Sequence, residues 1–360
     1  MSREPRVLVA GATGLVGRAA VDHFAARDGW AVAGLSRRPL HRADVRHVPA
    51  DLTDADACRA AVAAAGPFTH VLYAALYERR DVVAGWRDPE QMETNRAMLA
   101  HLLDAVEASS PGLRRVIALQ GGKAYGVHLR RVPVPAKERW PRASHEIFYW
   151  AQEDLLRERA GRGGWSYSIL RPQRILGDAL GSPLSIVAAL GVYAAVWREL
   201  GRPLEFPGGG RYVNACSDSR LIARAVEFCA TEDAAAGQTF NVVNGDLVVW
   251  RDLWPAVAAR FGMRPGGDRP LRLAEEMPRH GEVWRRLAER HGLRHAVMDD
   301  VTGRVWAYAD LVLGAGLDRP DDNVMSPVKL CQAGFTDCMD TEDAVVHWLD
   351  RLQRQRVLPR

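Results

Sequence analysis

A glycine-rich turn near the start of the chain constrains the fold more than any other feature. Gly11, Gly14 and Gly17 recur at three-residue spacing. They follow the apolar strand candidate Arg6–Gly11, and the helical pattern after them runs to about Arg27. A strand, three spaced glycines and a helix make up the phosphate-binding turn of dinucleotide-binding folds. The first glycine permits a tight turn, the second lets backbone approach a pyrophosphate, and the third lets the helix pack close to the strand. The free N–H groups at the start of the helix then favour an anion.

The residues after the second strand indicate which dinucleotide is bound. The strand candidate Ala31–Leu35 ends in Ser36, Arg37 and Arg38. An acidic residue is usual here when the ribose 2′-hydroxyl of NAD is bound, whereas arginine accommodates the 2′-phosphate of NADP. The arginine pair therefore favours NADPH/NADP+ as the cofactor. The alternative is a pair of solvated loop arginines.

Further cofactor contacts are expected where the backbone leaves each later strand. Asp51 follows the third strand, where it either hydrogen-bonds the adenine amine or caps the helix that begins near Ala55. Small residues after the fourth strand, beginning with Ala74, let backbone approach the cofactor. The expected cofactor-binding set is Gly11, Thr13, Gly14, Leu15, Val16, Gly17, Ser36, Arg37, Arg38, Asp51, Leu52, Tyr73, Ala74, Gln120, Tyr149, Arg171, Pro172 and Ile175.

The order of strand and helix patterns predicts an α/β fold. Strand candidates in the first half are Arg6–Gly11, Ala31–Leu35, Arg46–Pro49, His70–Tyr73, Arg114–Leu119 and Tyr167–Arg171. Helical patterns between them are Leu15–Arg27, Ala55–Ala65, Glu90–Ala108 and His145–Ala160. This alternation predicts a Rossmann-type doubly wound parallel sheet covered by helices on both faces.

After Pro172 the pattern becomes mainly helical. The later helix candidates are Leu184–Glu199, Asp218–Thr231, Leu253–Phe261, Val283–His291, Thr302–Leu313 and Thr341–Arg354. We expect residues 1–175 to form the cofactor-binding domain, with segments around 212–245 returning to it. Residues 176–360 are expected to form a smaller, mainly helical substrate lobe. Cofactor and substrate should meet at the carboxyl ends of the parallel strands.

Composition excludes several classes of function. The formal net charge is only +4 and the arginines are dispersed, so we expect no nucleic-acid partner. The longest apolar run, Ile186–Val196, is too short to cross a membrane, and no signal peptide precedes the first strand. The five cysteines are scattered and lack CxxC spacing, which is typical of free thiols in a cytoplasmic protein. His291 and His295 have no evident third ligand, so no metal site is expected.

Lys123 stands out because lysine is rare in this chain. Only three lysines are present, Lys123, Lys137 and Lys329, against 45 arginines. A chain that uses arginine for general positive charge keeps lysine where a compact ammonium is needed. Lys123 follows the strand candidate Arg114–Leu119, at the sheet edge where a nicotinamide would lie. It is therefore a candidate catalytic residue, and the alternative is a solvated loop lysine.

Tyr149 is the second candidate catalytic residue. It lies near the start of the helix candidate His145–Ala160. A short-chain dehydrogenase normally carries a lysine four residues after this tyrosine, and that ammonium lowers the tyrosine pKa for proton donation. Here the position is Glu153, and a carboxylate there would raise the pKa of Tyr149. The constellation for ordinary carbonyl reduction is therefore broken. Tyr149 has an alternative interpretation as a core or interface aromatic, and Tyr125 is a competing candidate.

Several segments spread over nearly the whole chain carry a family resemblance. The motifs are GATGLVG, SRR, LQGGKAYG, FYWAQED, LRPQRILG, CSDSRLIA and GFTDCMDTEDAVVHWLDRL. They resemble the progesterone-5β-reductase/iridoid-synthase group, which are atypical extended short-chain dehydrogenases. The resemblance implies NADPH-dependent reduction of a C=C bond conjugated to a carbonyl, with Lys123 and Tyr149 carrying the reaction. Two departures are a loop that is one residue shorter and Trp150 in place of the second tyrosine of the family's FYY pair.

The chemistry expected of Tyr149 and Lys123 agrees with the conjugate reduction that the family resemblance implies. Conjugate reduction develops negative charge on an enolate oxygen, which needs a hydrogen-bond donor such as the Tyr149 hydroxyl. Lys123 would support that dipole or order the loop over the nicotinamide. We expect a small apolar enone-type substrate and a monomer or homodimer. The alternatives are an epimerase/dehydratase or ketone reductase on the same scaffold, and a non-catalytic NADP(H) sensor.

Overall fold

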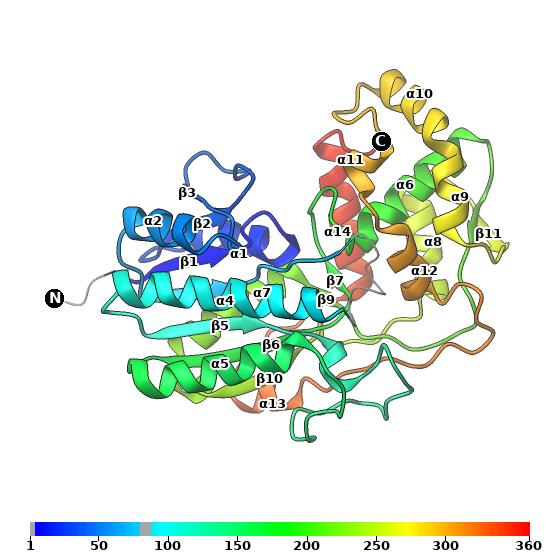
Figure 1. Ribbon diagram of the computed structural model, residues 1–360. Coiled ribbons are helices and arrows are strands. Elements are labelled where there is room, and N and C mark those ends of the chain that lie inside the picture. The colour runs from blue at the N-terminus through cyan, green and yellow to red at the C-terminus, as the bar shows by residue number, and fades with distance from the viewer. Residues whose placement is uncertain (1–3, 80–87) are drawn as a thin grey trace.

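A parallel sheet and a cluster of helices form two lobes that lie side by side (Figure 1). The computed structural model describes residues 4–79 and 88–360. The sheet has seven strands in the order β10-β6-β5-β4-β1-β2-β3, and every neighbouring pair is parallel. The strands are β1 (Arg6–Ala10), β2 (Ala31–Ser36), β3 (Arg46–Pro49), β4 (His70–Tyr73), β5 (Arg115–Leu119), β6 (Ser166–Pro172) and β10 (Gln238–Val242). The predicted doubly wound parallel sheet is confirmed.

Helices cover both faces of the sheet, so its central strands are apolar on both sides. One face carries α2 (Ala55–Ala65), α4 (Pro89–Ser109) and α5 (Phe148–Gly163). The opposite face carries α1 (Leu15–Ala25), α7 (Ser219–Thr231) and the short α13 (Val328–Gln332). Successive residues of one strand pack on opposite faces of the sheet. Leu8 packs on the face covered by α2 and α4, and Val9 packs on the face covered by α1 and α7. This alternation follows from the two-residue period of a strand.

The two lobes are interleaved along the chain. After α6 (Ile186–Glu199) has formed part of the helical lobe, the chain returns to the sheet lobe through α7 and β10, where β10 pairs with β6. The chain then builds the rest of the helical lobe and returns once more, because α13 packs against β10. Two short strands, β7 (Ile175–Leu176) and β9 (Ser217–Asp218), pair with each other where the chain crosses between the lobes.

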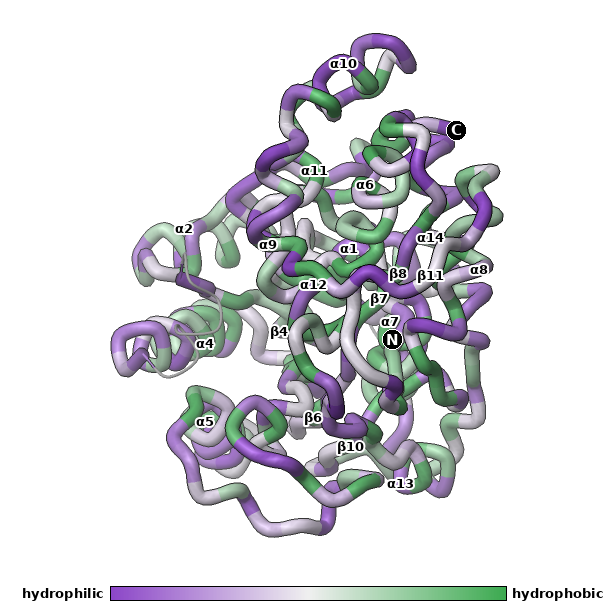
Figure 2. The backbone as a smooth tube through the Cα atoms, turned by 90° about the vertical axis from the view of Figure 1, so that its right-hand side faces the viewer, coloured by the Kyte–Doolittle hydropathy of each residue, from purple (hydrophilic) through white to green (hydrophobic). Residues whose placement is uncertain are grey.

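The helical lobe is built around α6. Every residue of α6 from Ile186 to Trp197 is buried, so this helix has no solvated face. Around it lie α8 (Trp250–Arg260), α9 (Leu273–Glu276), α10 (Gly281–His291), α11 (Met298–Thr302), α12 (Trp306–Leu313), α14 (Thr341–Arg354) and the strand pair β8 (Leu204–Phe206) and β11 (Pro265–Asp268). In Figure 2, α6 lies among the other helices whereas the more hydrophilic α10 projects at the rim.

One expected helix is wrong. The pattern Thr302–Leu313 predicts a continuous helix, but α11 ends at Thr302 and α12 begins at Trp306. Gly303 lies between them with φ +55° and ψ −127°, a conformation that glycine adopts readily and that ends the helix. A Cβ on Gly303 would lie 2.4 Å from the carbonyl oxygen of Gly181, so a close backbone approach causes the break.

Two expectations from composition can be compared with the structure. Within the described ranges, no helix combines the length and apolar character needed to cross a membrane. All five cysteines are free thiols: Cys58, Cys216 and Cys229 are buried, and Cys331 and Cys338 are exposed.

The Gly17 position generates a stability prediction with a matched control. A Cβ on Gly17 would lie 2.1 Å from the carbonyl oxygen of Gly11, and backbone cannot yield as a flexible side chain can. Gly17→Ala should therefore lower the free energy of unfolding by at least about 1–3 kcal/mol, as overpacking does. Gly161→Ala, also within a helix but with nothing near its would-be Cβ, should raise it by about 0.5–1 kcal/mol. Chemical denaturation of both variants measures the difference, and equal effects would contradict the close-packed turn.

Candidate active site

The turn between β1 and α1 forms a cradle that can accept a phosphate group. Gly11 has φ +81°, and a Cβ there would lie 2.7 Å from the backbone of Ala74. The Gly14 amide donates to the carbonyl oxygen of Gly11 at 3.0 Å, which closes the turn. Gly14 caps α1 without a side-chain hydrogen bond, and the first turn of α1 holds no acidic residue. The amino end of this helix therefore offers its N–H groups to an anion without competition from a protein carboxylate.

The end of β2 carries the two expected arginines at the surface. Ser36 is buried, and its hydroxyl donates to the carbonyl oxygen of Arg38 at 2.7 Å, which shapes the turn. The Arg37 side chain is 73% exposed and lies 3.6 Å from Asp51. Arg38 makes no ion pair within the part of the chain that the structure describes. Both guanidinium groups are thus accessible to a phosphate.

The alternative role of Asp51 as a helix cap is wrong. The cap of α2 is Asp54, whose carboxylate accepts from the amide of Ala57 at 3.0 Å. Asp51 instead accepts hydrogen bonds from the amide and hydroxyl of Thr53, at 3.0 and 2.9 Å. Its carboxylate stays at the surface beside Arg37, at the end of β3.

Some of the expected cofactor-binding residues turn their side chains into the core. Val16, Leu52 and Tyr73 are at most 4% exposed and belong to the apolar layers beneath the helices. Only the backbone of these residues reaches the sheet edge. Ala74 follows β4 beside Gly11, and Ile175 lies in β7.

Tyr149 lies at the carboxyl edge of the sheet, in the first turn of α5. Its hydroxyl lies 3.4 Å from the position that a Cβ on Gly121 would take, as does the carbonyl oxygen of Pro172. These three groups therefore converge where β5 and β6 end. Within the described residues, the Tyr149 hydroxyl makes no hydrogen bond. Burial raises the pKa of Tyr149, the charge of Glu78 raises it further, and Arg171 opposes the rise. The hydroxyl is therefore a proton-bearing donor at neutral pH.

Lys123 lies beside Tyr149, in the short 3-10 helix Gly122–Tyr125. Its ammonium nitrogen is 5.9 Å from the ring centre of Tyr149, 6.0 Å from that of Phe148 and 3.9 Å from a carboxylate oxygen of Glu78. Its side chain is only 15% exposed. Burial lowers the pKa of Lys123 to about 8, although attraction to Glu78 opposes the change. The structure thus brings the two expected catalytic residues together, and Lys123 is not a solvated loop lysine.

Glu78 is a site residue that the sequence analysis does not identify. Its side chain is 8% exposed, and the Gln91 amide donates to its second carboxylate oxygen at 3.3 Å. Glu78 follows β4, and Lys123 follows β5. These strands are neighbours, so residues just beyond them meet at one edge. The sequence shows an acidic residue after the fourth strand, but only the order of the strands in the folded sheet reveals that this residue pairs with Lys123.

Glu153 is neutralised by arginines and is not the carboxylate that acts on Tyr149. Its Oε1 accepts from Arg157 at 2.9 Å and lies 3.3 Å from Arg142, and its Oε2 lies 3.8 Å from Arg171. The pKa of Tyr149 is raised as expected, but the carboxylate that raises it is Glu78; the expectation that Glu153 does so is wrong. Glu153 instead anchors α5 to positive charge on neighbouring segments.

Gln120 and Arg171 tie the ends of β5 and β6 to α5. The Gln120 side chain accepts from Arg171 Nε at 2.8 Å and donates to the carbonyl oxygen of Tyr149 at 3.3 Å. Arg171 also lies over the rings of Tyr125 and Trp150, at 5.1 and 5.8 Å. This network positions the first turn of α5, and hence Tyr149, against the sheet.

Tyr125, the competing tyrosine, is occupied elsewhere. Its hydroxyl donates to Asn241 Oδ1 at 2.7 Å, and Asn241 is itself buried in β10. The hydroxyl therefore has a fixed structural partner, unlike that of Tyr149.

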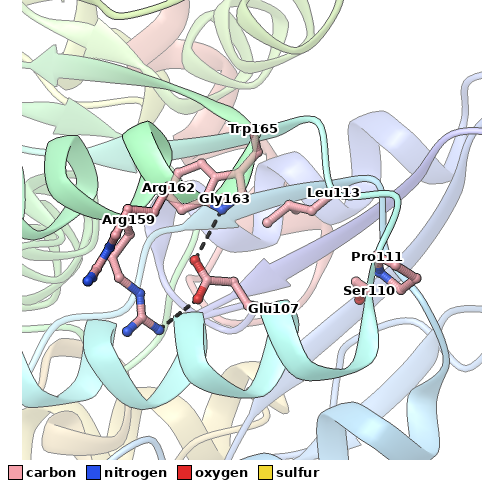
Figure 3. A pocket seen from close by; sticks show the side chains of 8 residues that line it. All are labelled: Glu107, Ser110, Pro111, Leu113, Arg159, Arg162, Gly163 and Trp165. Atoms are coloured by element: carbon pink, nitrogen blue, oxygen red, sulfur yellow. Dashed lines mark hydrogen bonds and ion pairs between the residues drawn. The ribbon is translucent and has the colours of Figure 1, made fainter.

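A cavity of about 400 Å³ lies at the opposite edge of the sheet (Figure 3). Leu113 and Trp165, which line it, precede β5 and β6 at their amino ends. Its carboxylate is already paired, because Glu107 accepts from the Trp165 ring nitrogen at 3.1 Å and lies 2.8 Å from Arg159. Ligands of open parallel sheets bind at the carboxyl ends of the strands, so this cavity is separate from the site at Tyr149.

Three comparisons with known proteins place this geometry in context. The family model of the PRISE-like Rossmann-fold domain matches residues 50–359. The 3-oxo-Δ(4,5)-steroid 5-β-reductase of Arabidopsis thaliana is 30% identical over 379 residues, covering 99% of this chain and 94% of that protein. An (S)-8-oxocitronellyl enol synthase of Nepeta cataria is 29% identical over 380 residues, covering 98% and 91%.

Solved structures agree on the fold. The UDP-glucose 4-epimerase of Thermus thermophilus, in complex with NAD, superposes with a TM-score of 0.66 at 21% identity, covering 97% of this chain and 99% of that one. A putative epimerase from Burkholderia cenocepacia superposes with a TM-score of 0.67 at 20% identity, covering 97% of this chain and 98% of that one. At these identities the likeness concerns the fold alone.

Proposed function

This chain belongs to the PRISE-like Rossmann-fold domain family, and we propose that it is an NADPH-dependent reductase of C=C bonds conjugated to a carbonyl group. The observation that carries the proposal is the Tyr149 hydroxyl. It is protonated, lies at the carboxyl edge of the sheet, and has no lysine one helical turn away. The Arabidopsis relative is named as a reductase of a 3-oxo-Δ(4,5)-steroid, in which the double bond is conjugated to the 3-oxo group.

The charges around Tyr149 favour conjugate reduction over ketone reduction. A ketone becomes an alkoxide, a strong base that needs a proton from an acid of lowered pKa. Burial and Glu78 raise the pKa of Tyr149, so its hydroxyl is poorly suited to give up a proton. An enolate oxygen is a weaker base, and a hydrogen bond from a neutral hydroxyl stabilises it. Glu153, held by arginines, cannot act as the missing lysine.

The cofactor cradle fits NADPH. When bound, the reduced nicotinamide supplies the hydride. The amino end of α1, at Gly14, would hold the pyrophosphate, and Arg37 and Arg38 would hold the 2′-phosphate. Lys123 would add positive charge near the developing enolate, since its ammonium lies against the Tyr149 ring.

An apolar substrate suits the side chains around Tyr149. Ile147 and Phe148 form a buried cluster with it, and Met92 and Trp150 pack at the margin. Such walls exclude water from the hydroxyl and strengthen its hydrogen bond to a substrate oxygen. The substrate class that fits is a small molecule with an apolar body and an enone.

The role of Tyr149 can be tested by removing only its hydroxyl. Tyr149→Phe should lower kcat by roughly a hundredfold to a thousandfold, the range for losing one oxyanion donor. NADPH oxidation would be followed with 2-cyclohexen-1-one, methyl vinyl ketone, progesterone and 8-oxogeranial, with a saturated ketone as control. Tyr125→Phe is the matched variant and should retain most of the turnover, because its hydroxyl is bonded to Asn241. Full turnover in Tyr149→Phe would remove the tyrosine from the mechanism, and reduction of the saturated ketone would favour the ketone-reductase alternative.

The charge on Lys123 predicts a pH dependence. Its pKa is about 8, so the ammonium is lost as pH rises through that value. If the ammonium stabilises enolate charge, kcat/KM for an enone should fall above about pH 8. Lys123→Arg stays protonated, so its kcat/KM should not fall above about pH 8. Lys123→Met should have a lower kcat/KM below pH 8 and no inflection near that pH. An unchanged inflection in both variants would assign the titration to another group.

Cofactor preference tests the arginines at the end of β2. Arg37→Ala combined with Arg38→Ala should weaken NADPH binding by roughly tenfold to a hundredfold, since hydrogen bonds to a charged group are lost, and should leave NADH binding almost unchanged. Arg59→Ala, another exposed arginine that is paired with Asp56, is the control. Fluorescence titration with both cofactors gives the ratio. A variant that keeps the wild-type preference for NADPH would make the arginine pair a solvated surface feature.

A further inference from the structure

Arg174 has a backbone conformation that side-chain-bearing residues rarely adopt. It follows β6 with φ +41°, in the left-handed region. The conformation is held by neighbours, because the Ser217 amide donates to the carbonyl oxygen of Arg174 at 3.4 Å and the Ser217 hydroxyl accepts from the Gln173 amide at 2.8 Å. Strained positions of this kind persist where surrounding structure fixes them, and they cluster at ligand sites.

The guanidinium of Arg174 has no anionic partner within residues 4–79 and 88–360. Its Nε is buried and makes no hydrogen bond there. Arg171, three residues earlier, shows the opposite arrangement, because Gln120 accepts from it and Glu153 lies 3.8 Å away. The adjacent Gln173 also leaves its side-chain oxygen buried and without a hydrogen-bond partner in the described structure. Two consecutive residues at the end of β6 therefore carry unused polar atoms.

One aromatic ring of the helical lobe lies beside this guanidinium, and the charge of Arg174 acts on a second tyrosine there. The guanidinium lies 5.8 Å from the ring centre of Tyr212. Burial raises the pKa of Tyr308 to about 12, and Arg174 is the strongest influence that lowers it. A half-buried guanidinium that has a buried, unpaired Nε and no carboxylate partner among the described residues can accept an incoming anion.

Arg174 is close to the reacting centre along the chain. The carbonyl oxygen of Pro172 and the hydroxyl of Tyr149 both lie 3.4 Å from the would-be Cβ of Gly121. Arg174 is two residues beyond Pro172, and successive Cα atoms are about 3.8 Å apart, so its Cα is at most about 8 Å from that of Pro172. The Arg174 backbone therefore lies at the same carboxyl edge of the sheet as the Tyr149 hydroxyl.

We propose that Arg174 binds a carboxylate carried by the substrate, so that the preferred substrates are enones with an acidic group at the far end of an apolar body. The proposal rests on the proposed enone reduction. The planar guanidinium fork matches a carboxylate with two parallel hydrogen bonds. A cofactor phosphate is the other oxyanion within the same chemistry. Tyr212, which lies beside the guanidinium, belongs to the helical lobe, whereas the phosphate cradle at Gly14 lies in the sheet lobe.

The test uses paired enones that differ only in charge. The substrates are methyl-ketone enones, CH3–CO–CH=CH–(CH2)n–COO−, with spacers of increasing length, and their methyl esters. The quantity measured is the ratio of kcat/KM for the acid to that for the ester, within each enzyme. Wild type should prefer the acid by roughly tenfold or more at one spacer length or over a narrow range, mainly through KM. Arg174→Gln should remove the preference and Arg174→Lys should keep part of it, while Arg211→Gln, at an exposed arginine paired with Asp252, should keep all of it.

A second measurement separates failure of this proposal from failure of the proposed function. Calorimetry with the saturated keto acid and its ester, in the presence of NADP+, reports binding without catalysis. Tighter binding of the acid by wild type and not by Arg174→Gln supports the site even if no enone is reduced, an outcome that would overturn only the reductase assignment. An equal acid-to-ester ratio in wild type and Arg174→Gln overturns the proposal while enone reduction stands. A raised KM for NADPH in Arg174→Gln, with the acid preference intact, would assign the guanidinium to a cofactor phosphate instead.

Discussion

The close contact between the backbones of Gly11 and Gly17 governs how the two lobes are assembled. A Cβ on Gly17 would lie 2.1 Å from the Gly11 carbonyl oxygen, so α1 can start against β1 only without that side chain. This placement aims the amino end of α1 at the carboxyl edge of the sheet. It also sets Arg18 3.4 Å from the buried carboxylate of Asp178, to which Arg351 of α14 is joined at 3.1 Å. The helical lobe is therefore fastened to the helix that carries the phosphate cradle.

The charged residues at the carboxyl edge of the sheet form two groups, one that holds α5 in place and one that lies beside Tyr149. Glu153 is neutralised by Arg157, Arg142 and Arg171, and Gln120 joins Arg171 to the first turn of α5. Lys123 and Glu78 form a second buried pair beside Tyr149, and burial brings the pKa of the lysine down to about 8. The same low-dielectric surroundings keep the Tyr149 hydroxyl protonated. In the reaction that we propose, this arrangement would donate a hydrogen bond and positive charge to an oxygen without supplying an acidic proton.

Arg171 and Arg174 show how one short segment serves two purposes. The first guanidinium is enclosed by a carboxylate, a carboxamide and two rings, so it contributes to the architecture. The second keeps a strained backbone and a buried nitrogen without a partner in the described structure. Because an unused buried donor is unfavourable, its position near the candidate site is the basis for proposing that a ligand completes it.

Features that depend on local patterns could be predicted from the amino-acid sequence. Apolar strands, helical periodicity and the spaced glycines predicted the parallel sheet and the phosphate cradle, and the rarity of lysine together with the helix start at Phe148 singled out Lys123 and Tyr149. Which of these residues meet, and what else joins them, depended on the folded chain. The order β4-β5 brings Glu78 to Lys123, the close approach of Gly181 ends a helix at Gly303, and β10 returns to the sheet after α6. The reason is physical: periodicity records only which face a residue buries, whereas ion pairs, strained turns and unpaired guanidinium groups arise between segments that are far apart in the chain.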